Sequence, residues 1–121
     1  MGKKQADSEY RSQVFGGFRT MWLITMFDLP VTSKEEKDDY RKFHDFLLAD
    51  GYTMMQYSVY MRPCPSEENA AVHRKRVKAA LPPNGEVRIL TFTDKQFERM
   101  QVFVGKTRAA TEKAPAQIEF F

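Results

Sequence analysis

Apolar residues gather into one short uninterrupted run early in the chain. Residues 21–27 read MWLITMF, and Asp28 and Pro30 follow them closely. A run of this length without alternation is typical of a strand buried on both faces, because each face of a sheet receives every second side chain. The pattern predicts a strand that ends at Asp28, since Pro30 cannot continue it.

The spacing of the apolar residues then changes to that of a helix. Tyr40, Phe43 and Leu47 recur at intervals of three or four residues, which places them on one helical face. A capping box begins at Ser33, with a glutamate three residues later, and Gly51 is a natural C-terminal stop. A helix between these two residues is predicted, with its apolar stripe on the sheet.

Four further segments complete the order of elements. Residues 52–62 are rich in strand-forming side chains and form either one bent strand or two short ones. Residues 66–81, capped by Ser66, have helical spacing, residues 86–92 alternate apolar with polar positions, and residues 100–104 are a last strand candidate. This order predicts an α+β fold of the ferredoxin-like βαββαβ kind with an extra C-terminal strand.

The extra strand leads to a hypothesis about assembly. A four-stranded sheet with two helices is already complete, so a spare strand is expected to pair with an exposed sheet edge, its own or that of a second copy. We therefore expect a homodimer of one ferredoxin-like domain, residues 21–105. Residues 1–20 are expected to form a flexible extension, and residues 106–121 a tail whose apolar end docks on the sheet or on a partner.

Composition and charge narrow the class of protein. The chain has 121 residues, 16 aromatic side chains and a formal net charge of +3, values that fit a globular domain with a mild preference for anionic partners. The single cysteine, Cys64, excludes an intrachain disulfide, and His44 and His73 lack the spacing of zinc ligands. No segment is long and apolar enough to cross a membrane, so a cytoplasmic protein is expected.

Three pieces of sequence resemble one known family. They are the strand end Phe27-Asp28-Leu29, the string Gln56-Tyr57-Ser58-Val59-Tyr60, and the late stretch 93–105. In this order they are similar to the Cas-two family, the smaller of the two CRISPR adaptation proteins. The resemblance implies a homodimer whose two Asp28 side chains face each other near the dimer axis, and whose last strand crosses to the other subunit. It also implies a partner, the Cas-one integrase, and a role in holding double-stranded DNA (the protospacer) during spacer acquisition.

The resemblance leaves an enzymatic alternative open. Some family members are described as metal-dependent nucleases acting on RNA or double-stranded DNA, so a magnesium-dependent endoribonuclease or DNase, including a toxin-type ribonuclease, is the rival hypothesis. Phe27 stands where the family usually has tyrosine, Met54 where it often has a basic residue, and Tyr60 where it usually has phenylalanine. A missing hydroxyl and a missing cation weaken the nuclease hypothesis, because cleavage requires stabilisation of developing negative charge. A third hypothesis is a small-molecule sensor, which needs no basic surface.

Asp28 is the candidate catalytic residue and metal ligand. Magnesium prefers oxygen ligands and keeps several waters, so one Asp28 carboxylate from each subunit is a candidate Mg²⁺ site. The structural alternative is that Asp28 caps the turn before Pro30 or pairs with a basic side chain.

Five basic residues are the candidates for binding nucleic acid. Lysine and arginine neutralise backbone phosphates without reading bases, although runs of charge are also common on solvated helix faces. The candidates are Lys34, Lys37, Arg41 and Lys42 on the first helix and Arg62 at the end of the central strand segment.

Overall fold

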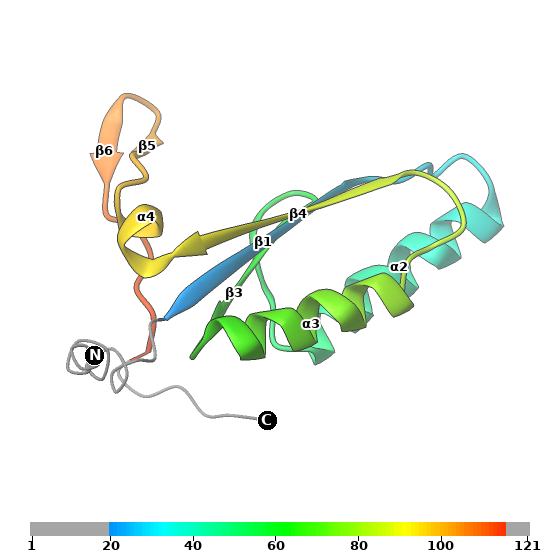
Figure 1. The fold of residues 1–121 in the computed structure, drawn as a ribbon. Coiled ribbons are helices and arrows are strands. Elements are labelled where there is room, and N and C mark those ends of the chain that lie inside the picture. Colours follow the sequence, from blue (N-terminus) through cyan, green and yellow to red (C-terminus); the bar gives the residue numbers. More distant parts are fainter. Residues whose placement is uncertain (1–19, 116–121) are drawn as a thin grey trace.

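An antiparallel sheet forms the centre of the described part of the chain, residues 20–115 of the computed structural model (Figure 1). Its spatial order is β2-β3-β1-β4, which is the strand order of a ferredoxin-like fold. The predicted α+β class and the βαββαβ order are therefore confirmed. The four strands are β1 (Met21–Asp28), β2 (Thr53–Gln56), β3 (Val59–Cys64) and β4 (Glu86–Thr93).

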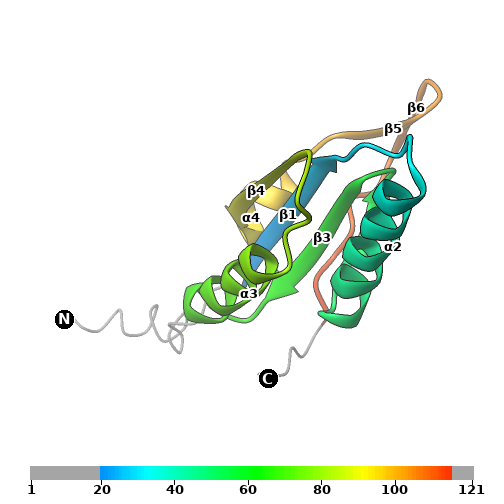
Figure 2. The same ribbon diagram turned by 90° about the vertical axis from the view of Figure 1, so that its right-hand side faces the viewer.

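Helices α2 (Lys34–Ala49) and α3 (Glu67–Ala79) cover the same face of this sheet (Figure 2). Helix α2 begins with the predicted capping box, in which the Ser33 side chain and Glu36 satisfy each other's backbone amides. Phe43 and Leu47 of its apolar stripe are buried against the sheet. Helix α3 begins at the predicted Ser66 cap but ends at Ala79, two residues before the predicted end.

The segment 52–62 forms two strands rather than one bent strand. A turn at Tyr57 and Ser58 separates β2 from β3, and β3 continues through Pro63 to Cys64. The pairing of β2 with β3 reaches only to Met61, so the rest of β3 has a free edge on its β2 side. Pro63 is tolerated there, because no hydrogen bond to β2 is needed.

The C-terminal part differs from the expected single strand at 100–104. Residues Asp94–Glu98 form a short helix, α4, between the two segments that were predicted as strands. A capping box of Thr93 and Gln96 starts this helix. The predicted strand begins later, as β5 (Val102–Val104). It pairs with a further strand, β6 (Thr107–Ala109), in a separate hairpin and not with an edge of the four-stranded sheet. Figure 1 places this hairpin and α4 together, away from α2.

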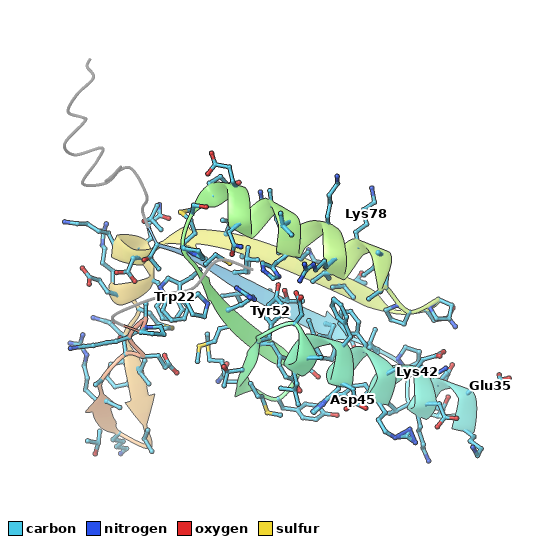
Figure 3. The ribbon with its side chains drawn as sticks, turned by 90° about the horizontal axis from the view of Figure 1, so that it is seen from below. Trp22, Glu35, Lys42, Asp45, Tyr52 and Lys78 are labelled. Atoms are coloured by element: carbon cyan, nitrogen blue, oxygen red, sulfur yellow. The ribbon has the colours of Figure 1, made fainter. Side chains whose placement is uncertain are left out.

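The two sheet faces carry different apolar clusters. Leu23 and Phe27 of β1 belong to the main core under α2 and α3. Trp22 and Ile24 point to the opposite face, where they pack with Phe97 of α4, and the Trp22 and Phe97 rings stack with centroids 3.9 Å apart. Figure 3 shows Trp22 beside α4, at the opposite end from Glu35 and Lys42 of α2. Helix α4 therefore covers one end of the second face.

Candidate nucleic-acid interface

Asp28 is the last residue of β1 and its side chain is exposed to solvent. Because strand residues alternate between faces, Asp28 shares the face of Trp22 and Ile24, which α2 and α3 leave uncovered. β1 runs away from α4, so Asp28 lies at the far end of this face (Figure 1). The strand ends at Asp28, as the sequence predicted, and the structure presents this carboxylate at the rim of the sheet.

The string from Gln56 to Tyr60 fixes the position of the β1 end. Ser58 adopts a left-handed backbone with φ of 63°, which is uncommon for a residue other than glycine. Its carbonyl accepts a hydrogen bond from the Phe27 amide at 3.1 Å, and its hydroxyl is 3.1 Å from the Tyr40 hydroxyl. The ring of Phe27 packs against those of Tyr40 and Tyr60. The strained turn thus holds the residue immediately before Asp28.

Gly85 supports Asp28 from the other neighbouring strand. Its φ is +96°, and a Cβ at this position would lie 2.6 Å from the Asp28 carbonyl oxygen and 2.7 Å from a methyl carbon of Leu29. Only glycine combines this backbone conformation with so close an approach. The turn before β4 is therefore packed directly on the backbone of the candidate site.

Two residues of β4 that were not expected at the site adjoin Asp28. The β1–β4 register places Glu86 opposite Asp28 and Arg88 opposite Met26. These side chains and Phe27 line a cavity of about 220 Å³. The Arg88 guanidinium lies 3.4 Å from a Glu86 carboxylate oxygen, and both side chains are largely exposed. The alternation of β4 predicts a shared face for Glu86 and Arg88, but only the strand register shows that they meet Asp28.

The donor set of the cavity gives limited support to a metal site. Asp28 and Glu86 contribute two carboxylates, the ligand type that Mg²⁺ uses together with water. Within residues 20–115 no cluster of three or more potential metal-ligating side chains occurs. Residues 20–115 of one chain therefore offer at most a two-carboxylate site at this cavity.

The four candidate cations of α2 are all exposed and lie within its first nine residues, nearer the Asp28 end of the sheet. Asp38 accepts from Arg41 at 2.9 Å and lies 3.5 Å from Lys34. Helix α2 contains five carboxylates beside its four basic side chains, so its surface is not strongly basic as a whole. The structure brings Lys34, Lys37, Arg41 and Lys42 to one surface, but it partly neutralises two of them.

Arg62 lies elsewhere, in the interior of the domain. Only 9% of the residue is exposed, and its guanidinium donates to the carbonyls of Asp50 at 2.6 Å and Pro63 at 3.0 Å. A Cβ on Gly51 would lie 2.9 Å from Arg62 Nε, so glycine is needed there for space as well as for its φ of +97°. Arg62 therefore binds the C-terminal end of α2 and is not part of the exposed basic surface.

Asp50 joins this arginine to α3. Its carboxylate lies 2.7 Å from His73 Nδ1 and accepts from Arg76 at 2.9 Å. Since a carboxylate only accepts, His73 carries a proton on Nδ1, and within the described residues His73 Nε2 is buried without a hydrogen-bond partner. Burial lowers the pKa of His73, and the nearby Arg62 and Arg76 lower it further, against the opposing effect of Asp50. His73 is thus a structural residue that links α3 to the end of α2.

The remaining polar candidates are also accounted for. Tyr60 is buried in the main core, whereas Tyr57 is 75% exposed and stacks on Tyr40 at 6.2 Å. Cys64 is buried, and burial raises the pKa of its thiol, so it is not a reactive nucleophile. Two predicted segments lie outside the described residues. They are residues 1–19 of the expected flexible extension and residues 116–121, the apolar end of the tail. Among the described helices none could cross a bilayer.

The fold and this site define a class: a small ferredoxin-like protein with an acidic strand end on an open sheet face. Comparison with known proteins narrows it, since residues 21–100 match the model of the family described as CRISPR associated protein Cas2. The chain belongs to this family.

Three relatives illustrate the similarity. All three are named CRISPR-associated endoribonuclease Cas2. The chain is 54% identical to the protein of Parvibaculum lavamentivorans over 84% of its own length and all of the relative. It is 41% identical to that of Flavobacterium psychrophilum, over 86% of this chain and 90% of the relative, and 44% identical to that of Paracidovorax avenae, over 87% and 97%. The resemblance stated from the sequence is confirmed.

Proposed function

We propose that this protein is a homodimeric adaptor that binds double-stranded DNA during CRISPR spacer acquisition, in the cytoplasm, between dimers of the Cas-one integrase. The observation that carries the proposal is the uncovered sheet face with Asp28 at its end. Trp22 and Ile24 are already buried there beside Phe97 and Ala114, whereas Val59 and Met61 are only partly buried. A second copy placed on this face would cover these partly exposed side chains and bring two Asp28 carboxylates toward one axis.

Further apolar side chains support association with a second copy. Leu90 of β4 is 39% exposed, and Phe103 and Val104 of β5 are 57% and 70% exposed. Burial of apolar surface contributes about 25 cal/mol per Å², so covering these side chains is favourable. A hairpin with exposed apolar residues next to an open sheet face fits the expected exchange of the last strand between subunits.

The exposed cations support contact with a duplex. Lys34, Lys37, Arg41 and Lys42 lie on one helix surface at the Asp28 end, where they can neutralise phosphates without reading sequence. The ion pairs that Lys34 and Arg41 make with Asp38 are exposed and therefore weak, so phosphates can replace them. The affinity of such binding falls as salt rises, because the protein displaces condensed counterions from the DNA and their release is less favourable in concentrated salt.

The alternative is a magnesium-dependent endoribonuclease or DNase. It is favoured by the names of the relatives, which are endoribonucleases, and by the pair of carboxylates at Asp28 and Glu86. In this case Asp28 is the catalytic metal ligand, and Mg²⁺ when bound supplies a Lewis acid for the phosphodiester. The protein's own groups then position the phosphate beside the ion.

One experiment separates the two functions. The wild-type protein and Asp28→Ala are each given RNA and duplex DNA with Mg²⁺, and each is also combined with the candidate integrase in a spacer integration assay. The adaptor function predicts co-purification with the integrase and undiminished integration by Asp28→Ala. Mg²⁺-dependent turnover that Asp28→Ala abolishes, without any stimulation of integration by the wild-type protein, would instead establish the nuclease.

A further inference from the structure

The cavity beside Asp28 contains an arginine whose role the strand structure does not explain. Met26, Asp28, Glu86 and Arg88 alternate with core-facing residues on β1 and β4, so all four point to the face without α2 and α3. A guanidinium on the rim of a sheet adds little stability by itself. Its place opposite Met26 puts it two residue pairs from the Asp28–Glu86 pair, on the same face of the sheet.

The charges of the cavity are unbalanced for a nucleic acid ligand. Asp28 and Glu86 are directly opposite each other in an antiparallel pair, where like charges destabilise the sheet. They would also repel a phosphate group approaching the cavity. Arg88 is the one cation among the five lining residues, and so the one group there that attracts an anion.

In the single chain Arg88 is also available to a ligand, at the Asp28 end of the face that is proposed to contact a second copy. Its nitrogen is 3.4 Å from Glu86, at the long limit of a hydrogen bond, and its side chain is 69% exposed. An ion pair so exposed is worth little, so its release costs little. A guanidinium presents parallel N–H groups that match two oxygens of one phosphate, which an ammonium cannot do.

We infer that Arg88 binds a backbone phosphodiester of nucleic acid at the mouth of the Asp28 cavity, and that Glu86 is its positioning residue when the cavity is empty. This inference rests on the proposed function, since it takes the phosphate from the nucleic acid bound there. It adds a site residue on β4, on the sheet face opposite to α2. The duplex or RNA strand would then contact the domain at the Asp28 end through two elements, β4 and α2.

The test compares Arg88→Ala, Arg88→Lys and Lys95→Ala with the wild-type protein. Lys95 is an exposed cation of α4 at the other end of the sheet, so its removal controls for net charge. Binding to one short mixed-sequence DNA duplex is measured by fluorescence anisotropy over a series of salt concentrations. Thermal unfolding and the mass in solution are recorded for each variant.

Arg88→Ala is expected to weaken binding about tenfold, the effect of removing one charge-assisted hydrogen bond to a phosphate. The slope of log K against log salt should become shallower by about 1, since one phosphate is no longer neutralised by the protein. Arg88→Lys should keep the wild-type slope and recover part of the affinity, and Lys95→Ala should match the wild type. All variants should keep the wild-type melting temperature and mass.

Three results would overturn the inference. One is that Arg88→Ala binds the duplex with the same affinity and the same salt slope as the wild-type protein. This result removes the inference and leaves the proposed function intact. Another is that Arg88→Lys loses as much affinity as Arg88→Ala and that both variants have a lower mass in solution than the wild type. Arg88 would then act in the association of two copies and not in phosphate binding. If the wild-type protein itself does not bind the duplex, the proposed function fails and the inference fails with it.

Discussion

The Asp50 carboxylate connects the end of α2 to α3, and the effect of its removal on stability can be worked out from its contacts. Only 5% of its side chain is exposed, and its carboxylate contacts His73 at 2.7 Å and Arg76 at 2.9 Å. Its backbone carbonyl holds Arg62 at 2.6 Å. The substitution Asp50→Ala removes the two side-chain interactions and keeps the backbone hydrogen bond, so it tests the carboxylate alone.

The two interactions of the carboxylate differ in strength. A hydrogen bond to a charged group contributes about 1.5–3 kcal/mol, and this applies in full to His73 because the imidazole is 1% exposed and water cannot replace the carboxylate. The Arg76 side chain is 48% exposed, so water can replace the carboxylate when it is removed. The ion pair of Arg76 with Asp50 therefore contributes only about 0.2–1 kcal/mol. Asp50→Ala is therefore expected to lower the free energy of unfolding by about 2–4 kcal/mol.

Urea unfolding at neutral pH, followed by circular dichroism at one fixed protein concentration, measures this change. The fixed concentration matters because association would contribute to the apparent stability. Asp50→Asn keeps an oxygen that accepts from His73 Nδ1 and should lower the free energy of unfolding by about 1 kcal/mol. Arg76→Gln is the matched control and should lower it by no more than about 1 kcal/mol. An Asp50→Ala variant as stable as Arg76→Gln would show that His73 does not depend on the carboxylate.

Three other predictions concern the same framework and the Asp28 end. Because burial lowers the pKa of His73 from 6.5 while Arg62, Arg76 and Asp50 face its ring, the unfolded chain binds more protons in acid. The contribution of His73 to the free energy of unfolding should therefore be complete above about pH 6.5 and should be lost as the pH falls through the folded-state pKa of His73. Urea titrations at several pH values should show a smaller loss of stability in acid for His73→Asn than for the wild type. An equal loss in both proteins would show that His73 is not the group responsible. Gly85→Ala should lower the free energy of unfolding by about 1–3 kcal/mol, measured in urea, since its Cβ would meet the Asp28 carbonyl at 2.6 Å; an unchanged midpoint would show that the turn relaxes freely. Asp28→Asn should raise the free energy of unfolding by about 0.2–1 kcal/mol at low salt by relieving repulsion from Glu86, with the gain disappearing in high salt, whereas a decrease in stability would show that the carboxylate is a structural cap.

The sequence pattern predicted the elements that depend on local rules. The capping box at Ser33, the stop at Gly51 and the buried run before Asp28 each follow from interactions within a few residues, and the structure has all of them. Helix α4 was missed because it is five residues long and buries one apolar side chain, Phe97, too few for a detectable period. The pairing of β5 with β6 was not predicted because β6 is three residues long and has no apolar run of its own after the turn at Gly105.

The site was predictable only in part. Asp28 was identified because it ends an apolar run, but Glu86 and Arg88 depend on the β1–β4 register, which a single sequence does not contain. Arg62 was expected in the exposed set, although it lies two residues from both Tyr60 and Cys64 and so shares their buried face of β3. The period of two already assigned it to the core face, where its charge is satisfied by the carbonyl of Asp50.

In the proposed function, two copies of this chain bind one DNA duplex together by neutralising its phosphates. Sedimentation velocity of the wild-type protein mixed with a short labelled duplex, repeated over a salt series, shows whether they do. The expected result is a complex containing two chains that dissociates steeply as salt rises. A complex of constant stability across the series, or a chain that sediments as a monomer with and without the duplex, would contradict it.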